Sequence, residues 1–208
     1  MMMEYETLKL GELKTNCYLI WEQKTKLALI IDPADDGVAI ADQIHQKHLK
    51  PQGILLTHGH FDHLLGLIDL KLIYNLPVYG SSEDNFFFKN TAKSASFWLK
   101  RKIDIPNIKG VDVDLEKVTR IELGEEKIEV IKTPGHTPGG VCFYCHRSKL
   151  LFSGDTLFAG TKGRTDMAYG SEDKLTKSIG ELLKLPEDVV VLPGHGWATT
   201  IGQEKILY

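Results

Sequence analysis

The 208-residue sequence has few cysteines, no long apolar run and no large excess of charge of either sign. Its three cysteines, Cys17, Cys142 and Cys145, are too few for a disulfide framework, so we expect a reducing, cytoplasmic setting. No apolar run approaches the roughly 20 residues that a membrane span requires. Residues 1–6 lack a basic region followed by an apolar core, so we expect neither a secretory signal nor a membrane partner.

Acidic and basic residues are nearly balanced, with 28 Asp and Glu against 25 Lys and Arg, for a formal net charge of −3. A surface that binds nucleic acid usually carries a basic patch, so we expect no nucleic-acid partner. The sequence also lacks a linker, a low-complexity stretch or a charge block that would divide it. Because expected strands and helices alternate in both halves, we predict a single α/β domain over residues 1–208.

Cys142 and Cys145 form a C-x-x-C pair inside a run that alternates like a strand. Residues three apart on a strand face opposite sides, so this pair is interpreted as structural and half-buried, not as a zinc or redox site. The histidines His45, His48 and His146 fall on a predicted helix face or hairpin, and we interpret them as solvated surface residues.

Hydrophobic periodicity predicts the regular elements. Strands are predicted in the β-rich region 5–31, notably at 16–21 and 26–31, and then at 53–56, 77–79, 118–123, 127–132, 140–146, 149–153 and 189–192. Helices are predicted at 37–50, ended by Pro51, at 63–74 as a buried helix, and at 171–185 with Ser171 as its N-cap.

The segment 81–110 is less regular and carries five aromatic residues among polar ones. One interpretation is a helix or two packed on the core. The other is a lid over a functional site or a subunit contact, because aromatic residues are enriched where surfaces bind.

One stretch, Thr57–His63, places three histidines and one aspartate within six positions, directly after the apolar run 53–56. Neutral imidazole and carboxylate groups are ligands of Zn²⁺, Mn²⁺ and Fe²⁺. A strand that ends in such a cluster can bring several of these donors to one point. Gly59 allows a tight backbone turn between two of the ligands, where a Cβ would be in the way.

Three later positions share a simpler pattern, in which a strand ends and a potential ligand lies beside a glycine. They are His136 in Pro134–Gly139, Asp155 after Gly154, and His195 in Pro193–Gly196. If the strands belong to one sandwich, these three residues and the four of the first cluster can converge on one rim.

The ordered set of these seven residues, preceded by Asp32 after a strand, resembles the metallo-β-lactamase superfamily over essentially the whole chain. The resemblance implies an αββα sandwich with a two-metal site at one edge, most often zinc, with iron or manganese as alternatives. It implies that the first metal is held by His58, His60 and His136, the second by Asp62, His63 and His195, that Asp155 bridges both, and that Asp32 steadies the ligand loop.

Within that superfamily, the runs Asn16–Tyr18, Ser153–Gly160, Gly163–Asp166 and Pro193–Gly196 are similar to short, glyoxalase II-like hydrolases. Those enzymes cleave hydroxyacylglutathione thioesters such as S-lactoylglutathione. This chain departs from the classical enzyme by ending soon after His195, without the added helical region. Arg164 and Asp166 also stand where the classical enzyme has a lysine and a tyrosine that contact the thiol carrier; Arg164 could still pair with a substrate carboxylate.

The hypothesis for the chemistry is therefore hydrolysis of a small-molecule thioester by a metal-bridging hydroxide that Asp62 orients. A thiolate leaves without a proton, because a thiol pKa is only about 8.5. A persulfide dioxygenase with one iron on His58, His136 and Asp155 is the alternative from another reaction class, and it shares the run Gly163–Asp166. Lactone hydrolysis and a non-catalytic metal-binding role also stay open. The sequence leaves the metal, the thiol carrier and the oligomeric state undecided.

Overall fold

The first half of the chain forms a six-stranded sheet in the order β1-β2-β3-β4-β5-β6. The computed structural model describes residues 3–208, so Met1 and Met2, at the start of the stretch expected to lack a secretory signal, lie outside it. β1, β2 and β3 pair antiparallel, and β4, β5 and β6 continue the sheet in parallel. The strands are β1 (Met3–Leu10), β2 (Thr15–Glu22), β3 (Leu27–Ile31), β4 (Lys50–Leu55), β5 (Val78–Gly80) and β6 (Val113–Asp114).

The second half forms another six-stranded sheet in the order β14-β13-β10-β9-β8-β7, antiparallel except for the pair β10 and β13. A small hairpin, β11-β12, stands apart from it. The strands are β7 (Arg120–Leu123), β8 (Glu126–Lys132), β9 (Val141–Cys145), β10 (Leu150–Gly154), β11 (Leu157–Phe158), β12 (Thr161–Lys162), β13 (Val190–Pro193) and β14 (Thr199–Thr200).

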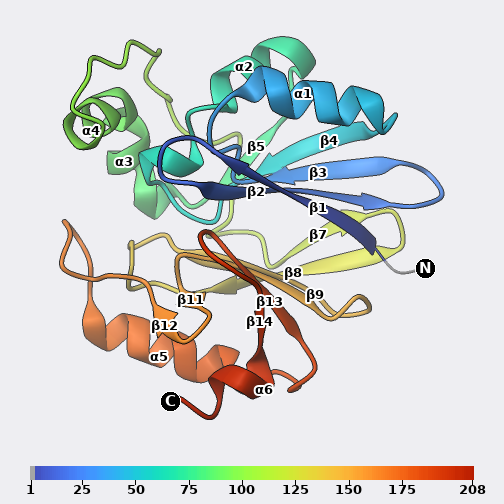
Figure 1. Cartoon of the computed structure of the whole chain (residues 1–208), viewed down its shortest axis with the longest axis vertical. Helices are drawn as coiled ribbons and strands as arrows, with labels where there is room; N and C mark the ends of the chain where they lie inside the picture. Colours follow the sequence, from blue (N-terminus) through green and yellow to red (C-terminus); the bar gives the residue numbers. More distant parts are fainter. Residues whose placement is uncertain (1–2) are drawn as a thin grey trace.

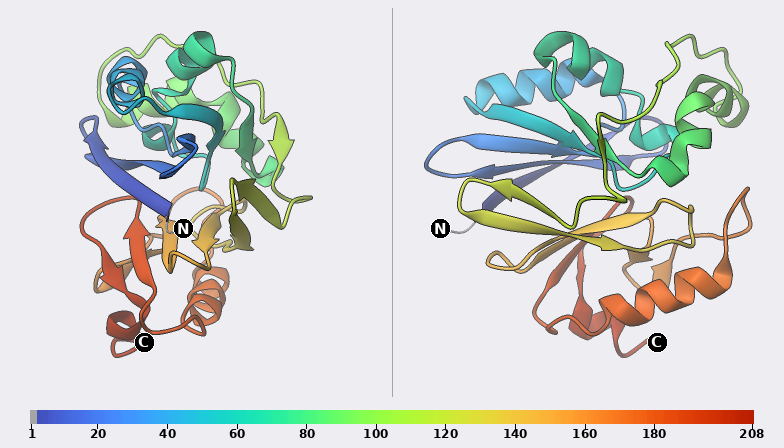
Figure 2. Two further views of the ribbon diagram at one scale, coloured as in Figure 1. Left: turned by 90° about the vertical axis from the view of Figure 1, so that its right-hand side faces the viewer. Right: turned by 180° about the vertical axis from the view of Figure 1, so that it is seen from behind.

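Helices cover the outer face of each sheet, so the layers run helix, sheet, sheet, helix (Figure 1). α1 and α2 lie on the first sheet, α5 and α6 lie on the second, and α3 and α4 stand at one end of the first (Figure 2). The helices are α1 (Gly37–Gln46), η1 (Phe61–His63), α2 (Leu67–Tyr74), η2 (Ser82–Asp84), α3 (Asn85–Lys89), α4 (Thr91–Trp98), α5 (Glu172–Leu182) and α6 (Ile201–Glu204). The αββα sandwich expected from the sequence is confirmed.

The core consists of three apolar layers, because each sheet packs on both faces. β2 is buried along its whole length: Leu19 faces the layer under α1 and α2, and Ile20 faces the layer between the sheets. β9 behaves in the same way, with Cys142 in the layer under α5 and Cys145 between the sheets. The two thiols are free and face opposite sides, as predicted, and both are fully buried instead of half-buried. Burial raises the pKa of the Cys142 thiol to about 11.

Two predicted helix boundaries were wrong. The helix predicted at 37–50 ends at Gln46, and Pro51 lies inside β4 instead of terminating a helix. The reason is a local cap: His48 adopts φ 54°, and Leu49 N–H donates to the Ile44 carbonyl, which turns the chain back into the sheet.

For the buried helix predicted at 63–74, a helix forms, but its start and its complete burial were wrong. The chain forms the short turn η1 first, and α2 begins only at Leu67, after Gly66 N–H donates to the Pro33 carbonyl. α2 is buried on one face only: Leu67 and Leu70 lie in the core, whereas Leu72 is 80% exposed. By contrast, Ser171 caps α5 as predicted, and His45, His48 and His146 are exposed. Within residues 3–208, no helix combines the length and apolar character needed to cross a bilayer.

Candidate metal centre

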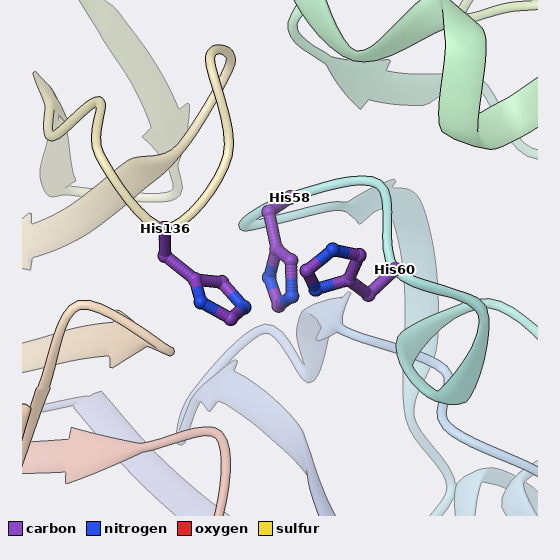
Figure 3. A group of neighbouring side chains, drawn as sticks. All are labelled: His58, His60 and His136. Atoms are coloured by element: carbon purple, nitrogen blue, oxygen red, sulfur yellow. The ribbon is translucent and has the colours of Figure 1, made fainter. Parts of the chain in front are cut away.

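All seven predicted ligands meet at one edge of the sandwich, because each follows a strand that ends there. His58, His60, Asp62 and His63 follow β4, and the other three follow β8, β10 and β13. Figure 3 shows the imidazoles of His58, His60 and His136 turned toward a common point. The two sheets therefore contribute to one cluster, although the residues are far apart in the sequence.

The seven side chains form two groups of three with one carboxylate between them. Donor atoms of His58, His60 and His136 lie within 4.8 Å of one another, as do those of Asp62, His63 and His195. Asp155 reaches both groups. Its Oδ1 lies 3.5 Å from His63 Nε2, and its Oδ2 lies 3.5 Å from His136 Nε2 and 3.6 Å from His195 Nε2. This is the arrangement that a bridging carboxylate would need.

Hydrogen bonds behind the cluster set the tautomer of two histidines in the first ligand stretch. Asp32 Oδ2 lies 2.6 Å from Thr57 Oγ1 and 2.8 Å from His63 Nδ1. Since the Thr57 hydroxyl donates to that carboxylate, it accepts from His58 Nδ1, 3.0 Å away. Both imidazoles thus carry a proton on Nδ1 and direct Nε2 into the cluster, where it is the atom that would bind a cation.

Backbone carbonyls do the same for two histidines from the second half. His136 Nδ1 lies 2.7 Å from the Arg164 carbonyl, and His195 Nδ1 lies 3.2 Å from the Leu13 carbonyl. A carbonyl only accepts, so each Nδ1 carries the proton and each Nε2 is left with a lone pair. Four of the five histidines are therefore held in the tautomer that binds a cation through Nε2.

The atoms that point into the cluster fit a cation better than they fit each other. His58 Nε2, His63 Nε2, His136 Nε2 and Asp155 Oδ1 are buried, and within residues 3–208 none of them has a hydrogen-bond partner. Leaving buried polar atoms unpaired costs about 1–3 kcal/mol each, which a native fold rarely tolerates without a purpose. Imidazole nitrogens and carboxylates around one point are the donor set of zinc, iron and manganese sites. The residues present therefore fit two divalent cations.

Asp32, His58 and His63 also place potential donor atoms within 4.8 Å of one another, but this group is already satisfied. Asp32 accepts from the Thr57 N–H, the Thr57 hydroxyl and His63 Nδ1. The Asp32 side chain thus holds the ligand loop from behind, as the resemblance implied, and its oxygens are occupied in that role.

The electrostatics of the cluster reflect a carboxylate-rich site. Burial lowers the pKa of His58 well below its usual value and that of His60 to about 3. His63 is equally buried, but Asp62, Asp32 and Asp155 overcome the desolvation and raise its pKa to about 10. Without a bound cation, a proton on His63 thus supplies positive charge to these carboxylates.

Glycines let the ligand loops approach one another closely. A Cβ on Gly194 would lie 2.2 Å from Asp155 Oδ1, and a Cβ on Gly154 would lie 2.4 Å from Thr57 Oγ1. Position 59 also requires glycine, because a Cβ there would lie 2.8 Å from the Phe87 Cβ. The φ of Gly59 lies outside the left-handed region, so its missing Cβ leaves room for Phe87 and Asp84 and does not serve a left-handed turn.

The cluster lies at the base of a cavity of about 800 Å³. Much of its wall comes from the segment 81–110, which forms η2, α3 and α4 and then continues without regular structure to residue 112. Phe86 packs against Tyr169 with ring centroids 5.0 Å apart, and Phe87 packs against His60 at 4.9 Å. The prediction that this segment packs as a helix or two is confirmed, and Phe86, Phe87 and Trp98 belong to the cavity wall.

Arg164 and Asp166, the predicted substrate contacts, both line the cavity and pair with each other. Arg164 Nε and Nη2 donate to the two Asp166 carboxylate oxygens, each at 2.7 Å, and the guanidinium lies over the Trp98 ring. Both side chains are exposed. The guanidinium charge is therefore already compensated.

Sequence reasoning missed several residues that hold the ligands. Thr15 Oγ1 donates to Asp62 Oδ2 at 3.0 Å, and Asn16 Nδ2 donates to the Pro193 carbonyl at 2.8 Å, beside the His195 loop. Thr57 and Asp84 also support ligand loops. Thr57 stands next to His58, and Asn16 lies in one of the recognisable runs, so both carried a signal. For Thr15 and Asp84 we find none.

A family model described as the metallo-β-lactamase superfamily matches residues 10–195. The chain belongs to the metallo-β-lactamase superfamily. Among its relatives, hydroxyacylglutathione hydrolase GloC of Haemophilus influenzae is 36% identical, over 98% of this chain and 95% of that protein. The probable metallo-hydrolase YqgX of Bacillus subtilis is 35% identical, over 98% and 95% of the two chains.

Solved structures show the same similarity. The B3 metallo-β-lactamase BLEG-1 matches with a TM-score of 0.90 at 35% identity, over 98% of this chain and 97% of that one. TTHA1623, solved in a di-iron-bound form, matches with a TM-score of 0.86 at 34% identity, over 96% of both chains. ETHE1 from Myxococcus xanthus matches with a TM-score of 0.79 at 25% identity, over 97% of this chain and 81% of that one. The chain is thus a member of this superfamily with a histidine and aspartate cluster suited to divalent metals, and it is similar to a relative named as a probable metallo-hydrolase.

Proposed function

We propose that this protein is a binuclear metal-dependent hydrolase that cleaves small thioesters of the hydroxyacylglutathione type. The observation that carries the proposal is the pair of ligand groups sharing Asp155 at the base of an open cavity. The similarity to a hydroxyacylglutathione hydrolase over nearly the full length of both chains supports the choice of substrate.

The seven side chains divide the work of holding two cations. His58, His60 and His136 would hold the first, Asp62, His63 and His195 the second, and Asp155 would bridge them. Two divalent cations at this position would lower the pKa of a water molecule and polarise the acyl carbonyl of the substrate.

Asp62 is the side chain that we assign to orienting the attacking water. It lies on the cavity wall, where Thr15 Oγ1 donates to its Oδ2 and His195 Nε2 lies 3.2 Å away. Burial works against its charge, but His63 and His195 outweigh it and hold the pKa of Asp62 well below its usual value. Asp62 is therefore ionised at neutral pH and accepts a hydrogen bond from water.

A thioester suits this cavity because its leaving group needs little help. A free thiol has a pKa of about 8.5, so the thiolate departs without a proton from the protein. The basic side chains that line the cavity already form ion pairs, Arg164 with Asp166 and Lys162 with Glu172. We propose that a substrate carboxylate meets Arg164 on the edge that Asp166 leaves free, and that the apolar part of the substrate packs on Phe86 and Trp98.

Zinc is the proposed metal, and iron is supported by the di-iron form of TTHA1623. We further propose a cytoplasmic location, because the three cysteines are unpaired thiols, and small molecules instead of nucleic acid or membrane as partners. We leave the oligomeric state open.

The second candidate is a persulfide dioxygenase that uses one iron on His58, His136 and Asp155. The observation that favours it is that this subset is complete within the cluster, with His136 Nε2 3.5 Å from Asp155 Oδ2. Lactone hydrolysis would use the same seven residues as the thioesterase and differs only in the substrate.

The deciding experiment measures metal content and turnover on protein purified without added metal. The substrates are S-lactoylglutathione, a lactone, a chromogenic cephalosporin (because BLEG-1 is named a β-lactamase) and glutathione persulfide with O₂ uptake. We expect two metals per chain and thioester turnover that is lost in His60→Ala and Asp62→Ala but kept in Asp104→Asn, a surface control. One iron per chain with persulfide-dependent O₂ uptake would overturn the hydrolase and establish the dioxygenase.

A further inference from the structure

Asp84 is a fully buried carboxylate that none of the expected functions uses. It ends η2, just outside the cavity, and its side chain has no cationic partner among residues 3–208. Its oxygens instead accept three short hydrogen bonds. Oδ2 accepts from Gly59 N–H at 2.7 Å and from Thr137 Oγ1 at 2.8 Å, and Oδ1 accepts from Gly139 N–H at 2.7 Å.

These three donors belong to the two loops that carry the first ligand group. Gly59 lies between His58 and His60, and Thr137 follows His136 directly. One loop leaves the first sheet and the other leaves the second, so Asp84 joins the two loops that carry the imidazoles shown in Figure 3. Asp32 bonds directly to the His63 imidazole, whereas Asp84 acts on the first ligand group through the loops that carry it.

Both loops have glycine where they approach Asp84. A Cβ on Gly59 would lie 2.9 Å from Asp84 Cβ, and a Cβ on Gly139 would lie 2.9 Å from Asp84 Cγ. Neither glycine has a φ in the left-handed region, so their common property is the space they leave for the carboxylate. Glycine at both positions therefore allows the two backbone N–H groups to reach the Asp84 carboxylate.

Asp84 is itself held in place by the turn that carries it. Asp114 accepts hydrogen bonds from the Ser82 N–H and hydroxyl, at 3.1 and 3.0 Å, and Glu116 accepts one from the Ser81 hydroxyl at 2.6 Å. These bonds fix η2 to the edge of the first sheet at β6. A carboxylate on a fixed turn can impose one geometry on both loops.

We propose that Asp84 is a positioning residue that sets the spacing of His58 and His60 against His136 and so determines the affinity of the first cation. The inference rests on the proposed function only in requiring that this group binds a cation. Supporting groups behind metal ligands typically contribute about 10- to 100-fold in metal affinity, and we expect an effect of that size.

The test is cation affinity in Asp84→Asn, measured by competition between metal-free protein and a chelator for Co²⁺ and then Zn²⁺. Asparagine keeps the shape, but its NH₂ faces either Gly139 N–H or the Gly59 and Thr137 donors, so at least one hydrogen bond is lost. We expect the affinity of the first site to fall about 10- to 100-fold, with a changed Co²⁺ absorption spectrum. Long-range ¹H–¹⁵N spectra of the zinc-loaded protein should show the change at His58, His60 and His136 and not at His63.

Glu126→Gln is the matched control, because Glu126 is also a buried carboxylate that accepts from a backbone N–H and a hydroxyl. It lies at the start of β8, beside the β9–β10 turn and away from the ligand loops, and should leave both cation affinities unchanged at a comparable loss of thermal stability. Thr137→Val removes one donor to Asp84 and leaves the carboxylate in place. It should weaken the first site less than Asp84→Asn, and it decides the question if Asp84→Asn does not fold.

Equal affinity in Asp84→Asn or Thr137→Val and in the wild type would overturn the positioning role, as would a loss shared by Glu126→Gln. A wild-type chain that binds no divalent cation would give a different result, since it would overturn the metal centre itself and this inference with it. A wild type that binds cations but hydrolyses no thioester would overturn only the proposed function and leave the role of Asp84 in place.

Discussion

At the scale of single residues, hydrogen bonds from Nδ1 orient four of the five imidazoles in the site. Two are held by the Asp32 and Thr57 pair and two by backbone carbonyls, so the ligand atoms are oriented before any cation arrives. Preorganisation of this kind reduces the ordering cost of binding. Asp32 and Asp62 have different roles: Asp32 is buried behind the ligands and orients His63, whereas Asp62 lines the cavity and can contact water.

Asp62→Asn should reduce thioester turnover about 10²- to 10⁴-fold, the range typical of removing a side chain that acts directly on the reacting water. Asparagine keeps the volume but lacks the ionised oxygen that orients water. The measurement is kcat on S-lactoylglutathione, with metal content determined on the same sample. Turnover within twofold of the wild type at full metal content would assign the water to another group.

Cation binding should become stronger as the pH rises, because the cation displaces a proton from His63. The three carboxylates around His63 raise its pKa to about 10, so the metal-free protein carries that proton at pH 7. The bound state holds fewer protons than the free state, so acidification favours the free state and weakens binding. Between pH 7 and pH 9 we expect about a tenfold gain in apparent affinity per pH unit.

Calorimetry in two buffers with different ionisation enthalpies measures that proton directly. His58 and His60 have lowered pKa values and are neutral in this pH range, so they release none. At least one proton should leave per chain on loading the second site. Binding without proton release would mean that His63 is neutral in the metal-free protein.

At the scale of elements, the ligand loops pack closely because glycines stand where the strands end. Gly154 closes β10 at φ 50°, and a Cβ there would press on Thr57 Oγ1. Gly154→Ala should therefore lower the free energy of unfolding by about 1–3 kcal/mol through overpacking and backbone strain. It should also weaken cation binding, because Thr57 orients His58.

Gly180→Ala provides the matched control for that substitution. Gly180 lies inside α5, and no other group of residues 3–208 stands within 4 Å of the position its Cβ would take. Alanine should stabilise the helix by about 0.4–1 kcal/mol. Urea unfolding of both variants gives the comparison, and equal stability changes would contradict the role assigned to Gly154.

The elements also show what a sequence can and cannot predict. The seven ligands were recognisable because each follows a strand end, and a strand end is a local feature. The supports of His136 and His195 were not, because a carbonyl of Arg164 or Leu13 has no side-chain signature. The early end of α1 depended on one left-handed residue, His48, which the apolar pattern of the helix did not reveal.

At the scale of the whole molecule, the metal centre links the two halves of the sandwich. Four ligands come from the loop after β4 in the first sheet, and His136, Asp155 and His195 come from the second. Away from that edge, the two sheets pack through the apolar layer that contains Ile20 and Phe152. Cation binding should therefore stabilise the edge at the site more than the interior of that layer.

Removal of the cations by a chelator should lower the melting temperature by about 5–10 °C. A free cation concentration of 100 times Kd stabilises the folded state by about 2.7 kcal/mol, and each kcal/mol changes the melting temperature of a chain of this size by about 2–4 °C. Hydrogen exchange should then accelerate at 57–63, 133–139 and 193–196. Amides of β2 and β9, which lie under apolar layers on both faces, should keep their protection. If hydrogen exchange accelerated uniformly across both sheets, the cations would support the global fold. If exchange did not change at the three loops, the hydrogen bonds behind the ligands would hold this edge of the sandwich without the cations.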